Sequence, residues 1–222
     1  LTPLIALQLS KPRLSGLVVL TTAAGHAMAQ PAALEPATLA ATLAGTFLCA
    51  SSANTLNQII EVDRDAKMAR TARRPLPSGR VTPQQALAWA AASGTGGVAA
   101  LALCAGPTTA LLGAGTIGLY AGVYTPMKPR TSYNTWVGAV VGAIPPLMGW
   151  TSAGASLVTP EALVLSSALF LWQIPHFMAL AWMYRADYAA GGYRMVPLTD
   201  PTGRATSEIC LRYSLYLSAL PV

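Results

Sequence analysis

The feature that most limits how this chain can fold is a succession of apolar runs, separated by short segments rich in Gly, Pro or charge. A helix of about 20 residues, at about 1.5 Å per residue, matches the hydrocarbon thickness of a bilayer. Runs of about this length predict spans near residues 12–31, 37–60, 85–105, 108–125, 134–153 and 160–185, with a seventh starting near 206. The sequence therefore predicts an all-α, polytopic transmembrane helix bundle with about six complete spans and the start of a seventh.

Composition and charge agree with a membrane protein and exclude some other classes. With 53% hydrophobic and 10% charged residues, the chain has too little polar surface for a soluble domain. Its formal charge of +6 comes from residues in short loops and not from one amphipathic surface, so no nucleic-acid partner is expected. The expected surroundings are a lipid bilayer.

The basic residues also sort to one side of the predicted membrane. The loops near 31–36, 106–107 and 154–159 carry no Lys or Arg, whereas cytoplasmic-type loops usually collect both. The other side receives Lys11, Arg13, Arg64, Lys67, Arg70, Arg73, Arg74, Arg80, Lys128, Arg130, Arg185, Arg194, Arg204 and Arg212. This distribution supports both the span count and the orientation.

Polar residues at the basic end of the second span form a candidate site. Asn57, Glu61 and Asp65 are spaced four residues apart, so on a continuing helix they lie within about 80° of one another. Mg²⁺ commonly uses one or two carboxylates together with substrate phosphate oxygens, so this stripe suggests a diphosphate site. A polar helix end entering a loop would show the same spacing. The cationic residues that follow favour the diphosphate site, because guanidinium and ammonium groups complement phosphate charge.

A second cluster lies at the end of the sixth span. His176, Tyr184 and Asp187 share a helical face if the helix continues. Asp187 could complete a metal or phosphate contact opposite Glu61 and Asp65, or it could be an interfacial aspartate. His176 is an ionisable residue inside the membrane, which is a functional candidate by default.

Other unusual residues in the spans are expected to be structural. His26 lies in the first span, and the cysteines lie in apolar stretches without a C-x-x-C pair. Free cysteine behaves as a small buried hydrophobe, so we expect packing roles for Cys49, Cys104 and Cys210.

The segment N-Q-I-I-E-V-D-R-D at 57–65 resembles the first signature of the UbiA prenyltransferase superfamily, N-x-x-x-D-x-x-x-D. Asn57 and Asp65 match this signature, while Glu61 replaces its first aspartate with a carboxylate that is one methylene longer. The segments 9–14, 135–150 and 172–181 resemble the haem-modifying members, so the resemblance covers nearly the whole chain. Because superfamily members have nine spans, the chain is expected to be one membrane-embedded prenyltransferase domain, 1–222, incomplete at its C-terminus.

The resemblance implies an activity and a set of site residues. The activity is transfer of a farnesyl group from farnesyl diphosphate to the vinyl group of protohaem IX (haem B), which makes haem O for haem A and cytochrome c oxidase biogenesis. The implied cofactor is Mg²⁺, which would neutralise the leaving diphosphate. The expected residues are Asn57, Glu61, Asp65 and Asp187 for catalysis; Glu61, Asp65 and Asp187 for the metal; Lys11, Lys67, Arg74 and Lys128 for the diphosphate; and His176 and Tyr184 for the haem acceptor.

Several alternatives remain open at this stage. His176 could ligate haem, donate to a haem propionate, or bond a neighbouring helix as a structural residue. Within the superfamily, the acceptor could instead be a quinone or chlorophyllide ring. A transporter would also contain intramembrane polar residues and broken helices, but its site would lie near the membrane midplane and not beside a cationic loop.

The location and partners also follow from resemblance. The segments 74–80 and 187–195 are similar to those of plant and algal mitochondrial members, which implies a multi-pass protein of the mitochondrial inner membrane, with the bacterial plasma membrane as the alternative. The chain begins at Leu1, so any targeting peptide would precede it. Haem A synthase or a second copy of the chain are possible protein partners.

Overall fold

The computed structural model describes residues 1–29 and 35–220, and all secondary structure in these ranges is helical. The helices are α1 Pro3–Leu9, α2 Pro12–Met28, α3 Pro36–Ile60, α4 Val62–Asp65, α5 Pro83–Cys104, α6 Pro107–Ile117, the π-helix η1 Gly118–Tyr124, α7 Thr125–Met127, α8 Asn134–Gly142, α9 Ile144–Ser152, α10 Pro160–Met183, α11 Arg185–Ala190, α12 Val196–Thr199 and α13 Arg204–Ser218.

Local sequence signals explain where the long helices begin. Each of α2, α3, α5, α6 and α10 starts with a proline, whose fixed φ suits the first helical turn and whose missing N–H would have no partner there. Thr82 caps α5 in a reciprocal pair with Gln85, and Thr159 accepts a hydrogen bond from the Ala162 N–H at the start of α10. These signals place the helices close to the predicted spans.

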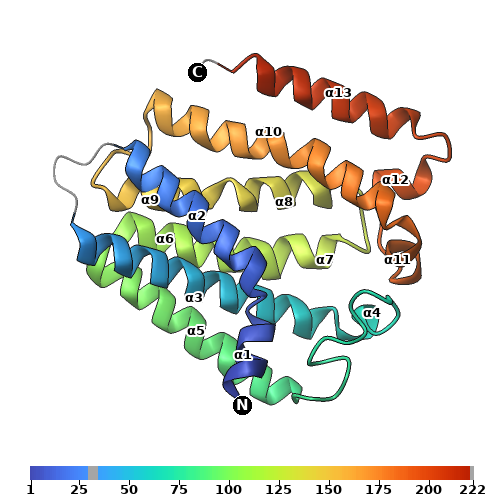
Figure 1. Cartoon of the computed structure of the whole chain (residues 1–222), viewed down its shortest axis with the longest axis horizontal. Coiled ribbons are helices and arrows are strands. Elements are labelled where there is room, and N and C mark those ends of the chain that lie inside the picture. The colour runs from blue at the N-terminus through green and yellow to red at the C-terminus, as the bar shows by residue number, and fades with distance from the viewer. Residues whose placement is uncertain (30–34, 221–222) are drawn as a thin grey trace.

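The long helices alternate in direction between two ends of the molecule, as predicted. Figure 1 shows the ends of α3, α7 and α10 at the same end as α4, α11 and α12, where the basic loops lie. By length and composition, α3, α5 and α10 qualify as membrane spans among the described residues. The all-α bundle is therefore confirmed, while the full span count stays a prediction.

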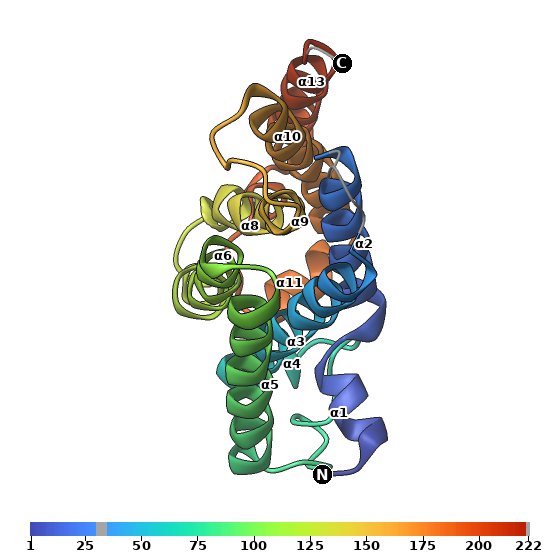
Figure 2. The ribbon, with the colours of Figure 1, turned by 90° about the vertical axis from the view of Figure 1, so that its left-hand side faces the viewer.

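The helices pack into a closed group with an extension (Figure 2). α2 contacts α3, α3 contacts α5, α5 contacts α6, α6 contacts α9, and α9 returns to α2. α10 packs on α8 and α9, and α13 packs on α10. The polar ends of α3 and α7 thereby come together at one end of the closed group.

Close contacts between backbones hold this group together. A Cβ added at Gly149 in α9 would lie 1.8 Å from the Thr22 carbonyl oxygen in α2, and one added at Gly25 would lie 2.0 Å from the Pro146 carbonyl oxygen. Beside this contact, His26 Nδ1 lies 2.9 Å from Ser152 Oγ. His26 is thus buried against α9, as expected of a structural residue.

Prolines and breaks do not coincide everywhere in the long helices. Pro145 and Pro146 stand at the start of α9, directly after the break at Ala143, where a missing N–H is tolerated. α10 continues through Pro175, so that proline does not end its helix. The predictions that one helix carries Asn57 to Asp65, and another His176 to Asp187, are wrong: α3 ends at Ile60 and α10 ends at Met183.

The physical reason is the same in both cases. Glu61 (φ −100°, ψ 9°) and Tyr184 (φ −106°, ψ 26°) leave helical geometry, and a new short helix begins after each. Glu61 still keeps Asp65 nearby, because its carbonyl accepts a hydrogen bond from the Asp65 N–H at 2.8 Å. The break at Tyr184 instead starts α11 as a separate helix that carries Asp187.

Candidate functional site

Two buried carboxylates form the centre of the site. Glu61 and Asp65 are 4% and 0% exposed, and Asn57, one turn before Glu61, is 1% exposed. Asn57 Nδ2 donates to Glu61 Oε2 at 2.7 Å and to Thr125 Oγ1 at 3.1 Å. Burying two carboxylates is costly unless cations or hydrogen-bond donors accompany them, so their surroundings indicate what the site is built to hold.

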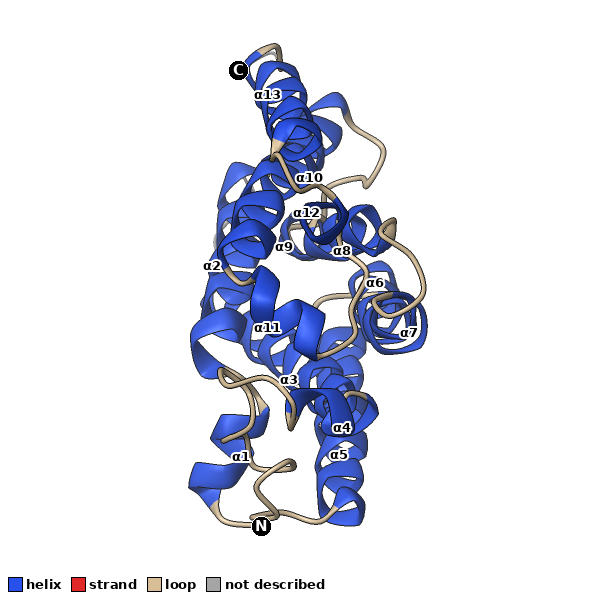
Figure 3. Ribbon diagram, turned by 90° about the vertical axis from the view of Figure 1, so that its right-hand side faces the viewer, coloured by secondary structure: helices blue, strands red, loops and turns tan. Residues whose placement is uncertain are grey.

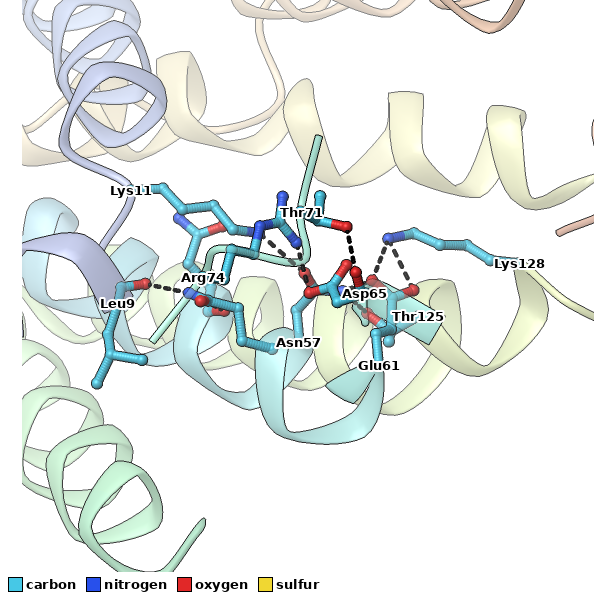
Figure 4. A network of polar contacts seen from close by, with 11 residues as sticks. Leu9, Lys11, Asn57, Glu61, Asp65, Thr71, Arg74, Thr125 and Lys128 are labelled. Atoms are coloured by element: carbon cyan, nitrogen blue, oxygen red, sulfur yellow. Dashed lines mark hydrogen bonds and ion pairs between the residues drawn. The ribbon is translucent and has the colours of Figure 1, made fainter. Parts of the chain in front are cut away.

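Three cations from different parts of the chain surround these groups (Figure 4). Arg74 Nη1 lies 2.6 Å from Asp65 Oδ2, and Lys128 Nζ lies 3.0 and 3.1 Å from the two oxygens of Glu61. Lys11 Nζ donates to Asn57 Oδ1 at 2.9 Å. With three cations around two carboxylates, the cluster can accept additional negative charge.

The backbone at Lys11 is held in an unusual conformation. Lys11 has φ 48° and ψ 66°, in the left-handed region that non-glycine residues rarely adopt. Buried polar groups of α3 secure the residues before it: Gln58 Nε2 donates to the Leu9 carbonyl at 2.8 Å, and Asn54 Nδ2 to the Ser10 carbonyl at 3.4 Å. These contacts stabilise the strained turn, so that the Lys11 side chain meets Asn57.

A π-helical turn brings the opposite side of the site into place. In η1 the helix widens, and the Thr125 hydroxyl donates back five residues to the Tyr120 carbonyl at 2.8 Å. π-helical turns frequently occur at functional sites. The turn places the Thr125 hydroxyl within hydrogen-bond distance of Asn57. Lys128 follows three residues later, and its ammonium lies 4.7 Å from the Tyr124 ring centroid.

An opening leads to Glu61 between the end of α3 and the loop after α7. A cavity of about 380 Å³ is lined by Ile60, Glu61, Arg64, Thr125, Pro126, Pro129 and Arg130. Glu61 is therefore reachable from one side although its carboxylate is buried. A small charged group could enter here and meet both carboxylate and cationic groups.

The structure brings six of the ten predicted site residues into one network, namely Lys11, Asn57, Glu61, Asp65, Arg74 and Lys128. The side chains of the other four make no hydrogen bond or ion pair with this network among the described residues. Lys67 is exposed, and its side chain forms no hydrogen bond or ion pair with the described residues. His176 is exposed and stacks on Trp172, with ring centroids 4.8 Å apart, and no described group hydrogen-bonds its ring. The Tyr184 ring lies 5.1 Å from the Arg70 guanidinium.

The predicted set of three metal ligands is not assembled in this structure. Among the described residues, no three His, Cys, Asp or Glu side chains lie close enough to hold one metal ion. Asp187 is half-buried at the start of α11, which the break at Tyr184 separates from α10. Its part in the site stays a prediction, as does that of Lys67, His176 and Tyr184.

Sequence analysis missed several residues of the network. Thr125 follows an apolar run and belongs to no recognised motif. Its position three residues before Lys128 is only a weak indication of a site residue. Thr71 donates to the Asp65 carbonyl at 2.8 Å and fixes the loop after α4. Tyr193 lies between two cations of the site, at 5.8 Å from the Arg64 guanidinium and 5.9 Å from the Lys128 ammonium. Such contacts depend on the tertiary fold and leave no local pattern.

An all-helical bundle of apolar helices, with buried carboxylates and cations at one end, defines a membrane protein with a charged site at one end of its bundle. The model of the UbiA prenyltransferase family matches residues 18–222. The chain belongs to this family.

Curated relatives share much of the sequence. The mitochondrial protoheme IX farnesyltransferases of Arabidopsis thaliana and Homo sapiens are 48% and 45% identical over 96% and 99% of this chain, which spans only 49% and 50% of their length. The protoheme IX farnesyltransferase of Solibacter usitatus is 41% identical over 95% of this chain and 75% of its own length. The mitochondrial relatives and the spanning helices support a multi-pass protein of the mitochondrial inner membrane.

Solved structures share the fold. A UbiA homolog from Aeropyrum pernix K1 superposes with a TM-score of 0.79 at 19% identity, over 94% of this chain and 77% of that one. A UbiA homolog from Archaeoglobus fulgidus, bound to DMAPP and Mg²⁺, superposes with a TM-score of 0.76 at 16% identity, over 97% and 75% of the two chains. The predicted UbiA-type bundle is thus confirmed.

Proposed function

We propose that this protein transfers a farnesyl group from farnesyl diphosphate to the vinyl group of protohaem IX, with release of diphosphate and addition of water to the former vinyl carbon, producing haem O for haem A and cytochrome c oxidase biogenesis. The observation that carries the proposal is the buried network of Glu61, Asp65, Lys11, Arg74 and Lys128 at the end of apolar helices. The choice of protohaem as the acceptor rests on the names of the relatives at 41–48% identity.

The carboxylates suit a hard divalent cation such as Mg²⁺. Asp65 Oδ1 is buried and forms no hydrogen bond with the described residues. Glu61 Oε1 meets Lys128 only as an ion pair without hydrogen-bond geometry, so it too retains a lone pair. Oxygen atoms of this kind are the ligands that Mg²⁺ prefers, usually alongside substrate phosphates. We propose Glu61 and Asp65 as ligands, with Asp187 as a third participant once α11 approaches.

The cations are arranged to bind the diphosphate. Arg74 and Lys128 each touch one of the carboxylates, and Lys11 touches Asn57, so all three converge on one small volume. When a cation satisfies the carboxylates, these three side chains become available to phosphate oxygens. A bound Mg²⁺ would add Lewis-acid stabilisation of the charge on the leaving diphosphate. Lys67, in the exposed loop after α4, would contribute long-range attraction.

The rest of the substrate fits the bundle. A farnesyl chain is apolar, and its burial between helices contributes about 0.8 kcal/mol per CH₂ without any specific polar contact. His176 and Tyr184 remain our proposed acceptor contacts. The stacked and exposed pair of Trp172 and His176 offers a flat aromatic surface on α10, as a porphyrin would require. Haem A synthase or a second copy of the chain remain proposed partners.

Product analysis tests this function. Membranes that contain the protein are supplied with haem B and farnesyl diphosphate, with and without Mg²⁺, and with a quinone and a chlorophyllide in parallel. Magnesium-dependent haem O is the expected product. Prenylation of the quinone or chlorophyllide alone would overturn the acceptor, and no prenyl transfer to any acceptor would overturn the enzymatic function.

The pH dependence should reflect Lys11. Burial, followed by the nearby charges of Arg74 and Lys128, lowers the pKa of Lys11 from 10.5 to about 7. A lysine with a lowered pKa loses its charge as pH rises through that value, so kcat/KM for farnesyl diphosphate should fall above about pH 7. In Lys11→Arg the charge persists, and kcat/KM should stay level between about pH 7 and pH 8.5. An identical decline in both proteins would show that another group titrates.

A further inference from the structure

Two successive residues of α3, Asn57 and Gln58, hold Lys11 at its two ends. Asn57 Oδ1 accepts a hydrogen bond from the Lys11 ammonium at 2.9 Å. Gln58 projects about 100° further round the helix, and its Nε2 donates to the Leu9 carbonyl, at the end of α1, at 2.8 Å. Asn57 thus fixes the ammonium, while Gln58 fixes the backbone from which the lysine side chain starts.

The turn between α1 and α2 needs this support. Lys11 precedes Pro12, and a residue before proline favours an extended backbone. Lys11 instead has φ 48° and ψ 66°, and it is the one residue other than glycine with a positive φ among residues 1–29 and 35–220. A strained conformation of this kind persists only where surrounding contacts hold it. Without them the turn would relax, and the Lys11 ammonium would leave Asn57.

Three side chains on one face of α3 supply those contacts. Ser51, Asn54 and Gln58 are spaced three and four residues apart, so they project from the same side of the helix. Ser51 Oγ lies 2.6 Å from Ser10 Oγ, and Asn54 Nδ2 donates to the Ser10 carbonyl at 3.4 Å. All three α3 side chains are buried. Because the Gln58 bond is the shorter of the two to a backbone carbonyl, Gln58 is the principal contact that holds the turn.

The rest of α1 is anchored independently of Gln58. The Leu9 side chain is buried in a cluster with residues of the loop that follows α4, and Figure 3 shows α1 beside that loop. The Arg80 guanidinium, from the same loop, donates to Gln8 Oε1 at 2.8 Å. Removal of the Gln58 amide should therefore loosen the turn without detaching α1.

We propose that Gln58 is a positioning residue of the diphosphate site, which holds the backbone before Lys11 so that the Lys11 ammonium meets the substrate phosphates. This role depends on the proposed function of the site in binding diphosphate, and it does not depend on the acceptor. Gln58 is fully buried, so it acts through Lys11 and not by contact with the substrate. When the turn relaxes, only the fraction of molecules with Lys11 in place binds tightly, and the apparent affinity falls by that fraction.

A double-mutant cycle measures this contribution. Gln58→Met keeps the length of the side chain but removes its amide, and it should weaken binding of farnesyl thiolodiphosphate, an unreactive analogue, by about 10-fold at saturating Mg²⁺. Lys11→Gly removes the ammonium, and glycine accepts the left-handed turn. In that background, Gln58→Met should change the affinity by less than about twofold. An equal loss in both backgrounds would show that Gln58 acts on something other than Lys11 and would overturn the proposal.

Amide hydrogen exchange tests the turn without any ligand. In Gln58→Met, exchange at the Ser10 and Lys11 amides should become faster by about fivefold or more, whereas residues 125–131, on the other side of the site, should stay within about twofold. Unchanged exchange at Ser10 and Lys11 would overturn the proposal. If the turn loosens but the unaltered chain binds no analogue, the proposed diphosphate site is itself overturned, and the role of Gln58 in that site falls with it.

Gln173→Met is the matched control. Gln173 also joins two helices through its side-chain amide, which donates to the carbonyls of Leu169 and Ala139 at 2.9 and 3.2 Å. The control should leave the affinity for the analogue within about twofold, and a loss equal to that of Gln58→Met would overturn the proposal. All variants are measured as the full chain in detergent by calorimetric titration, with melting temperatures recorded alongside.

Ser15→Ala keeps the test decisive if Gln58→Met fails to fold. Ser15 Oγ donates to the Ser10 carbonyl at 2.6 Å, and alanine suits this position in α2 because it favours helix. The substitution should loosen the same turn to a smaller extent and weaken binding of the analogue by about threefold. Full affinity in Ser15→Ala would then overturn the proposal.

Discussion

Asp65→Asn is expected to reduce the rate of prenyl transfer by about 10²–10³-fold, the size of effect seen when one group that stabilises developing charge is removed. Asparagine has the shape of aspartate and can still accept the hydrogen bond from Arg74, so the local fold should persist. The charge, however, disappears, and one carboxylate oxygen that is buried without a partner becomes part of a neutral amide. The metal would then lose one of two buried anionic ligands.

The control is two residues away. Asp63 lies in the same short helix α4 but is exposed, so Asp63→Asn makes the same change of charge outside the site. Turnover and its Mg²⁺ dependence are measured for both variants, together with melting temperature. Equal rates in the two variants, or a loss in Asp65→Asn that follows from unfolding, would remove Asp65 from the catalytic residues.

Gly149→Ala is expected to produce the largest loss of stability. The new methyl carbon would lie 1.8 Å from the Thr22 carbonyl oxygen and 2.7 Å from the His26 nitrogen, both of which are backbone atoms in α2. No change of rotamer can relieve a contact with backbone, so α2 and α9 must separate. Overpacking of this kind costs about 1–3 kcal/mol or more, and close helix contacts through small residues are a main source of stability in membrane bundles.

The melting temperature in detergent measures this effect, with Gly96→Ala as its control. Gly96 lies inside α5, and a Cβ there meets no atom within 4 Å. That substitution should be neutral or should stabilise by up to about 1 kcal/mol, because alanine favours helix more than glycine. If both variants melt at the same temperature, the α2–α9 contact is not the tight junction that the geometry indicates.

The sequence predicted an all-α bundle of apolar helices because hydrophobic length is set by the bilayer and not by tertiary detail. Glu61 and Asp65 were chosen as candidates from their spacing, and the structure places both in one buried network. The breaks at Glu61 and Tyr184 could not be predicted, because a change of backbone geometry at one residue leaves the apolar pattern intact. For the same reason, the separation of Asp187 from the carboxylate pair became visible only in the structure.

Tyr193 and the turn at Lys11 illustrate a second limit. Tyr193 lies near the site because Arg64, Asn134 and Lys128 hold residues 191–194 from three other parts of the chain. Lys11 adopts its left-handed conformation because α3 secures the residues before it. Neither arrangement has a local signature, so sequence analysis could place Lys11 in the diphosphate site only by charge and resemblance, and it did not place Tyr193 there.

The π-helical turn in η1 gives this span one residue more than its path requires. A π-turn absorbs an extra residue, so the helical segments on either side keep nearly the phase that an α-helix one residue shorter would give them. Deleting one residue between Gly118 and Tyr124 would therefore turn η1 into a regular α-helix and leave Lys128 facing Glu61. Deleting a residue between Thr125 and Lys128 would instead turn Lys128 by about 100° around the axis and away from Glu61. The loss of one residue is thus tolerated inside the turn and disruptive just beyond it.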